Sequence, residues 1–100
     1  MDINGSVQDG IINVVISGKL DMNNALTAEQ YFLKYAESGN KFVLDFSDVV
    51  YITSAGIRAL LTLYRAVSET GGYVTIKNPQ ETVVEVLNET AFADLFNIQK

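Results

Sequence analysis

The sequence has no cysteine, no histidine and a single proline, and the first two absences exclude whole classes of site. Without cysteine there is no disulfide framework and no thiolate chemistry. Without histidine or cysteine, a zinc site would have to consist of carboxylates alone, which zinc disfavours. A serine hydrolase would also lack the base that normally takes the serine proton. We therefore expect no catalytic residue, no metal site and no cofactor.

Long hydrophobic runs and clusters of basic residues are missing as well. Arg58, Thr62 and Arg65 interrupt the most apolar region, so no stretch has the roughly 20 apolar residues that cross a bilayer. The first residues lack the basic and apolar regions of a secretion signal. Seven basic residues stand against twelve acidic ones, and no basic cluster could neutralise a nucleic-acid backbone. The sequence predicts a cytoplasmic protein with no nucleic-acid partner and no direct membrane insertion.

What is present is the composition of an ordinary globular protein. The chain has 100 residues, of which 48% are hydrophobic and 19% charged. A second core would leave each half too small to bury enough apolar surface, so residues 1–100 are predicted to form one domain. No heptad pattern or long unprotected strand is evident, which favours a monomer or a weak dimer.

The order of elements follows from hydrophobic periodicity and turn residues. Strands are expected at 3–7 and 11–17, around a hairpin turn containing Asp9-Gly10, at 42–44 in the middle of the sheet, and at 73–77. Helices are expected after an asparagine cap at residues 23–24, from Ser54 to about Thr70, and from an Asn78 cap with Pro79 at its first position. Residues 91–98 are expected to close one edge of the core. This order indicates an α/β fold with a mixed sheet.

Ser54 is the candidate functional residue, because it lies where a strand meets the following helix. The first backbone N–H groups of a helix have no internal partner, and such a junction accepts an anion such as a phosphate. Ala55 and Gly56 are small and would let a kinase approach the hydroxyl. A phosphate would also add negative charge near Asp21, and near Asp45 and Asp48 if their loops share the same rim.

Two other roles for Ser54 have to be weighed. On residue preference alone, the serine could simply cap the helix. Residues 54–56 also resemble half of the G-x-S-x-G elbow of hydrolases, but Ile52 replaces the first glycine and no histidine is available as the base. Catalysis by Ser54 is therefore not expected.

The helix after Ser54 has a wide apolar face. Besides the stripe predicted to be buried, it carries further small and apolar residues next to a polar arc. Either a neighbouring helix covers the additional apolar surface or it is a strip on which a partner docks. The residues of this candidate docking strip are Ile57, Arg58, Ala59, Thr62, Leu63 and Ala66.

Several segments together carry a family resemblance. They are Gly18 to Asp21, Val43 to Val49, Tyr51 to Ile57, and Gly71-Gly72 before a strand. This combination resembles the STAS domain of bacterial anti-sigma factor antagonists over nearly the whole chain. The resemblance implies a single STAS-like domain, a mixed sheet of four to five strands with helices mainly on one side, and no catalysis.

The resemblance also implies a mechanism. An unphosphorylated antagonist binds an anti-sigma factor serine kinase and so releases a sigma factor; the kinase phosphorylates the antagonist, and a phosphatase resets it. The position that matches the phosphorylated serine is Ser54, Gly56 matches the glycine of the motif, and Asp21 matches an aspartate beside the phosphosite.

One residue departs from the family pattern. Thr53 replaces the acidic residue that precedes the phosphoserine, which affects recognition by the kinase and makes Thr53 itself a second candidate target. Domains with this kind of change can bind partners without being switched. The resemblance therefore leaves a second class open, in which the chain is an accessory subunit or scaffold of a membrane transporter or signalling complex.

Overall fold

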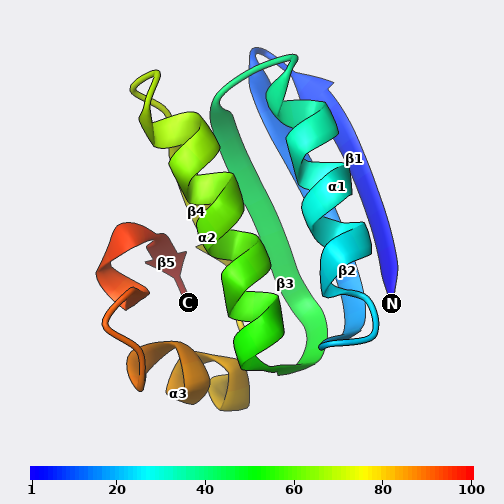
Figure 1. Ribbon diagram of the computed structural model, residues 1–100, viewed down its shortest axis with the longest axis vertical. Helices are drawn as coiled ribbons and strands as arrows, with labels where there is room; N and C mark the ends of the chain where they lie inside the picture. Colours follow the sequence, from blue (N-terminus) through cyan, green and yellow to red (C-terminus); the bar gives the residue numbers. More distant parts are fainter.

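A computed structural model describes residues 1–100, which form one five-stranded sheet and three α-helices (Figure 1). The strands follow the order β1-β2-β3-β4-β5 across the sheet. β1 is antiparallel to β2, whereas β2, β3, β4 and β5 are parallel to one another. The predicted α/β fold with a mixed sheet is confirmed. The elements are β1 Asp2–Gln8, β2 Ile11–Leu20, α1 Ala25–Ala36, β3 Lys41–Ile52, α2 Ser54–Ser68, β4 Tyr73–Lys77, α3 Glu81–Asn88, the short 3₁₀ helix η1 Ala93–Leu95 and β5 Asn97–Gln99.

The turn between β1 and β2 has the geometry that its sequence predicts. Asp9 and Gly10 both have positive φ, at 54° and 78°, and Gln8 pairs directly with Ile11. A two-residue hairpin turn with two positive φ angles matches the twist of the flanking strands, and Asp-Gly is a preferred pair for it.

The third strand is much longer than predicted. The sequence suggests a short strand at 42–44 and a separate apolar patch at 49–52, but β3 runs without interruption from Lys41 to Ile52. Its pairing with β2 slips twice, between Val15 and Ser17 and between Gly18 and Lys19, and each slip inserts one extra residue in β3. Such β-bulges keep a strand paired through polar residues. β2 correspondingly extends to Leu20, through residues expected to lie in a loop.

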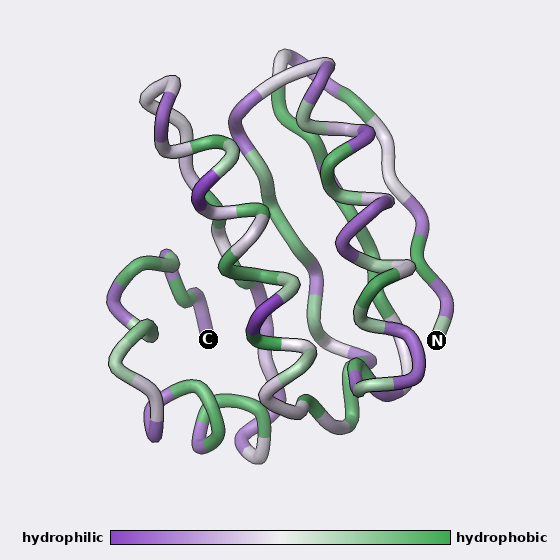
Figure 2. Tube along the Cα trace, in the orientation of Figure 1, coloured by the Kyte–Doolittle hydropathy of each residue, from purple (hydrophilic) through white to green (hydrophobic).

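The two long helices lie side by side on one face of the sheet (Figure 1). Side chains alternate along the strands, so one set from each of the central strands β2 and β3 is buried beneath these helices. In β2 and β3 the fully buried set is Ile12, Val14, Ile16, Leu20, Phe42, Leu44, Phe46, Val49 and Ile52. Figure 2 shows hydrophobic stretches along the strands behind the helices, interrupted by hydrophilic ones. Helices mainly on one side of the sheet are thus confirmed.

The third helix begins later than predicted. Gln80 is its N-cap, and Asn78 instead takes a positive φ of 56° in the turn after β4. The backbone N–H of Asn78 donates to the carbonyl of Gln99, which ties this turn to β5. At the end of the chain, Phe96 is buried against the core and β5 adds a parallel edge strand beside β4. The expectation that this segment closes the core is confirmed for Phe96 and Ile98 only, because Phe92 and Leu95 are exposed.

Candidate functional site

The carboxyl ends of β2 and β3 bring together two loops that are 32 residues apart in sequence. The loop after β2 begins at Asp21, and the junction between β3 and α2 is at Thr53 and Ser54. The backbone N–H of Thr53 donates to the carbonyl of Leu20 at 3.0 Å. Asp21 is therefore placed beside the start of α2, as predicted. We call this edge, formed by residues 21–24 and 51–55, the strand-end rim; it is the lower end in Figure 1.

Gly56 allows α2 to start so close to β2. A Cβ atom at this position would lie 2.6 Å from the carbonyl oxygen of Leu20 and 2.9 Å from Cγ1 of Ile52. Both distances are shorter than real Cβ contacts. Gly56 is itself buried, so its role is close packing inside the domain, and the space it leaves does not face a visiting protein.

Ser54 is exposed and is the first residue of α2. The N-cap is Thr53, and no side chain makes a capping hydrogen bond to the helix. The alternative that Ser54 serves as the cap is therefore wrong. Its hydroxyl lies at the surface, beside backbone N–H groups of the first turn that have no partner within the helix.

Thr53 behaves differently from its neighbour. Its Oγ1 atom is buried and has no hydrogen-bond partner. The hydroxyl of an N-cap threonine usually accepts a hydrogen bond from a backbone N–H of the first helical turn, and the Thr53 hydroxyl does not. Burial keeps Oγ1 out of reach of another protein in this conformation, which argues against Thr53 as a phosphorylation target.

The loop at Asp21 is held by its own hydrogen bonds. The backbone N–H of Asn23 donates to Oδ1 of Asp21 at 3.0 Å. Asn24 is the N-cap of α1, but its side chain accepts the N–H of Asp21 and donates to the carbonyl of Lys19, at 3.0 and 2.7 Å. The predicted asparagine cap is thus in the right place, yet its side chain fixes the loop instead of capping the helix.

Asp45 does not reach this rim, contrary to one expectation. It lies within β3, seven residues before Ile52, and pairs with Lys77 of β4. The backbone N–H and the hydroxyl of Ser47 donate to its Oδ1 at 3.0 and 2.7 Å. These two bonds, and the charge of Lys77, hold the pKa of Asp45 below its usual value, while partial burial opposes them. Asp45 stabilises a β-bulge and is separated from Ser54 by about 20 Å of strand.

A hollow of about 340 Å³ lies next to Ser54, between the first turns of α1 and α2. Two of its lining side chains are strongly exposed apolar groups, with Met22 82% and Leu26 64% accessible. Neither residue is predicted from the sequence as part of the site. A signal was available for Leu26, which lies off the buried stripe of α1 and so presents a leucine to solvent. The lining residues are Met22, Ala25, Leu26, Glu29, Ala55 and Arg58.

The predicted docking strip along α2 is only partly at the surface. Ile57, Ala59 and Leu63 are buried in the core or against the neighbouring helix, so their assignment to an exposed strip is wrong. α1 packs beside α2 and covers this surface, which is the other explanation the pattern allowed. Arg58 is exposed, and Thr62 and Ala66 are half-buried.

A family profile and a relative of known function agree on the family of this chain. The STAS domain family profile matches residues 2–100. The anti-sigma-B factor antagonist of Bacillus subtilis (strain 168) is 26% identical over 100 residues, covering 98% of this chain and 92% of that protein.

Solved structures share the fold. A Thermotoga maritima protein provisionally assigned as an anti-sigma factor antagonist superimposes with a TM-score of 0.90 at 24% identity, covering 98% of this chain and 86% of that chain. The Bacillus anti-sigma factor antagonist SpoIIAA matches at 14% identity in two forms. Its unphosphorylated form has a TM-score of 0.78 and covers 99% and 88% of the two chains, and its phosphorylated form has 0.76 and covers 99% and 92%.

A second kind of relative is a transporter. Sulfate transporter 2.1 of Arabidopsis thaliana is 38% identical over 52 residues, which is 52% of this chain and 8% of the transporter. No helix of the present structure is long and apolar enough to cross a membrane.

Proposed function

The chain belongs to the STAS domain family, and on that premise we propose that it is a cytoplasmic, non-enzymatic anti-sigma factor antagonist. Unphosphorylated, it binds an anti-sigma factor serine kinase and thereby releases a sigma factor. Phosphorylation of Ser54 switches this binding off, and a phosphatase restores it. The observation that carries the proposal is the exposed hydroxyl of Ser54 at the uncapped start of α2.

The relatives support this proposal in two ways. One relative, an anti-sigma-B factor antagonist, aligns with almost the whole length of this chain. SpoIIAA, which shares the fold, is an anti-sigma factor antagonist known in unphosphorylated and phosphorylated forms. Ser54 lies where a phosphoryl group can be added without entering the core.

The chemistry belongs to the kinase, and this chain supplies the acceptor. A bond forms between Oγ of Ser54 and the γ-phosphorus of ATP as the bond to the ADP oxygen breaks, and the hydroxyl proton passes to a base of the kinase. The product carries roughly −1.5 to −2 charges at neutral pH. The free N–H groups of the first turn and the positive end of the helix dipole tolerate this charge locally, so the fold is expected to survive.

The docking surface is proposed to be the strand-end rim together with the adjacent hollow. Met22 and Leu26 present apolar side chains on one side of Ser54, and Tyr51, 51% accessible, presents another. Arg58 supplies a positive charge at the wall of the hollow. An apolar surface rimmed by charge is typical of a protein-binding site. A phosphate on Ser54, in the middle of this surface, would repel an acidic partner. A partner without acidic charge would have to remove the water bound to the phosphate before it could dock.

The test is phosphorylation by the cognate kinase. The wild-type protein and the Ser38→Ala variant are expected to gain one phosphate with ATP, because Ser38 is an exposed serine at the far end of α1. Ser54→Ala is expected to gain none and still to bind the kinase. Ser54→Asp is expected to keep its thermal unfolding midpoint and bind at least 10-fold more weakly. Transfer of phosphate to the Ser54→Ala protein would show that Ser54 is not the switch.

The alternative function is an unswitched accessory subunit or scaffold of a transporter or signalling complex. The match to a sulfate transporter favours it, as does Thr53, which replaces the family's acidic residue and buries its hydroxyl. Co-purification from the native cell decides between the two. Recovery of transporter components without a sigma-system kinase would select this alternative.

A further inference from the structure

We propose that Arg58 is the intramolecular partner of the phosphate on Ser54, and that pairing withdraws this cation from the docking surface. The inference rests on the proposed phosphorylation of Ser54 and adds a second step to it. In this account the switch has two parts, a negative charge gained at Ser54 and a positive charge lost from the hollow beside it.

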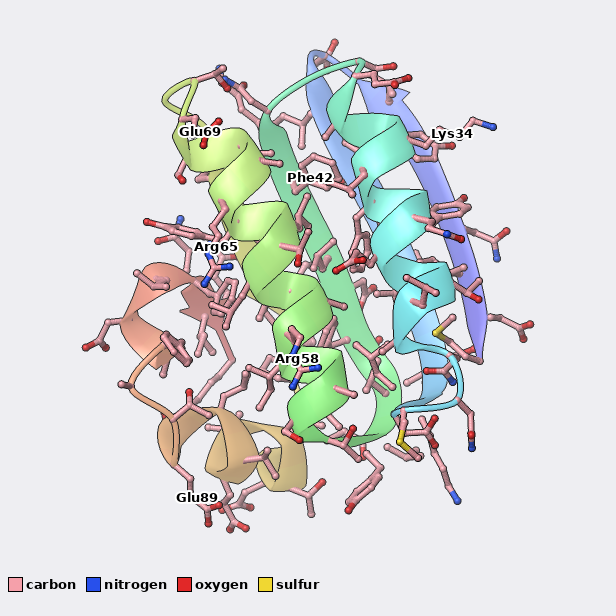
Figure 3. All side chains as sticks on the ribbon, in the orientation of Figure 1. Lys34, Phe42, Arg58, Arg65, Glu69 and Glu89 are labelled. Carbon is pink, nitrogen blue, oxygen red and sulfur yellow. The ribbon has the colours of Figure 1, made fainter.

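Helix geometry brings the two side chains together. Ser54 and Arg58 are both exposed and are four residues apart in α2. Residues at i and i+4 lie on the same face with Cβ atoms about 5–6 Å apart. Long side chains in a helix point back toward its N-terminus, so the guanidinium of Arg58 extends over the turn that begins at Ser54. Figure 3 shows Arg58 on the outward face of α2 near that turn.

Arg58 has no partner that would have to be given up. Neither its guanidinium nor the Ser54 hydroxyl makes a hydrogen bond, and the structure contains no ion pair. Glu29 of α1 lines the same hollow and is the nearest competitor that the hollow contains. A phosphate carries more charge than a carboxylate and binds guanidinium through two parallel bonds. Arg58 is therefore expected to pair with the phosphate in preference to Glu29.

The other charged residues at this end of the sheet offer the phosphate no cation on the same helix face. Asp21 lies beside the start of α2, and Asp48 is exposed farther back on β3. Asp21 would repel a phosphate on Ser54. Lys19 is exposed next to Tyr51 in the register of β2 with β3, one strand away from the helix. Arg58 is thus the basic residue on the same helix face as Ser54.

The pairing has a consequence for the docking surface. Arg58 forms part of the wall of the hollow that Met22 and Leu26 also line. Once its guanidinium binds the phosphate, the hollow keeps the carboxylate of Glu29 without the nearby cation. An acidic partner that used Arg58 in the unphosphorylated state would then lose its counter-charge.

The test is a ³¹P NMR titration of protein that carries phosphoserine at position 54. The phosphoserine is incorporated genetically during synthesis, so the test does not depend on any kinase. Arg65→Gln is the matched control, because Arg65 is exposed on α2 but lies three turns beyond Ser54 (Figure 3). Pairing with a cation favours the dianion, so Arg58→Gln is expected to raise the second pKa of the phosphate by roughly 0.2 to 0.7 unit. Arg65→Gln is expected to leave it unchanged, and Arg58→Lys to restore part of the shift.

An identical phosphate pKa in the wild-type and Arg58→Gln proteins would overturn the inference. Equal shifts in the Arg58→Gln and Arg65→Gln proteins would overturn it too, since the effect would then be one of net charge. Neither result bears on whether a kinase phosphorylates Ser54. Conversely, if the kinase failed to modify Ser54, the proposed function would be wrong, but the pairing of Arg58 with a phosphate at position 54 would still hold.

Discussion

The two ends of α2 are built in opposite ways. At its C-terminal end, Nδ2 of Asn40 donates to the carbonyl of Thr70 at 2.9 Å and to its hydroxyl at 3.2 Å. The Gly72 N–H donates to the carbonyl of Val67, and the Tyr73 N–H to the carbonyl of Asn40. At its N-terminal end no side chain caps the helix, the Thr53 hydroxyl is buried without a partner, and Ser54 is exposed.

This difference assigns separate roles to the two ends of α2: one contributes to the stability of the fold, and the other is accessible to a partner. The C-terminal end satisfies its carbonyl groups and joins the helix to β3 and β4, so it contributes to folding. The N-terminal end leaves polar groups free at the surface and surrounds them with exposed apolar side chains. Substitutions at the first end should therefore change the free energy of unfolding and leave binding intact. Substitutions of the exposed residues at the second end should weaken binding and leave the free energy of unfolding nearly unchanged.

The largest expected effect on stability is at Gly72. A Cβ atom there would overlap the backbone of Asn40, which cannot move without disturbing β3. Gly72→Ala is expected to lower the free energy of unfolding by about 3 kcal/mol, measured by urea denaturation. Gly71→Ala is the matched control, because its Cβ would meet nothing within 4 Å and only its φ of 79° opposes the change. A cost of about 1 kcal/mol is expected there, and equal costs for the two variants would contradict the packing described for this end.

A smaller effect is expected at Asn40. Replacing it with alanine removes the two hydrogen bonds to Thr70 and should lower the free energy of unfolding by about 1 kcal/mol. Binding of the partner kinase should be unchanged, because Asn40 lies at the opposite end of the domain from Ser54. Asn4→Ala is the control, since Asn4 is exposed on β1 and its side chain makes no hydrogen bond. If Asn40→Ala weakened partner binding, the separation between the two ends would not hold.

The smallest effect is expected at Thr53, with the opposite sign. A buried hydroxyl without a partner is costly, and valine keeps the branched shape of the side chain. Thr53→Val is expected to raise the free energy of unfolding by about 0.5 to 1 kcal/mol, seen as a higher thermal midpoint. Thr82→Val, at an exposed site on α3, should stay within about 0.5 kcal/mol of wild type. A clear loss of stability in Thr53→Val would mean that the hydroxyl has a bonding role.

Local signals in the sequence were enough to predict much of the fold. The Asp9-Gly10 turn, the buried stripe of α2 and its stop at Gly71-Gly72 each depend on residues close together in the chain. The length of β3 could not be predicted in this way. Its polar stretch from Asp45 to Asp48 looks like a loop, and the bulges that keep it paired depend on the register with β2.

The site, like the fold, could be predicted from the sequence only where it depends on residues close together in the chain. The position of Ser54 at the start of a helix follows from the sequence, and so does its nearness to Asp21 once the strands are parallel. Which apolar residues of α2 stay exposed does not, because it depends on how α1 packs beside it. Ala59 and Leu63 are covered for this reason, while Met22 and Leu26 of the neighbouring segment remain at the surface.

We propose that a partner binds at the strand-end rim and that the phosphate acts there. Amide hydrogen exchange of the domain with and without its kinase, before and after phosphorylation of Ser54, tests this directly. We expect added protection in residues 21–29 and 51–58 for the unphosphorylated complex, loss of that protection after phosphorylation, and unchanged exchange in the core strands. Protection centred on the Asn40 and Gly72 end, or protection at the rim that survives phosphorylation, would contradict it.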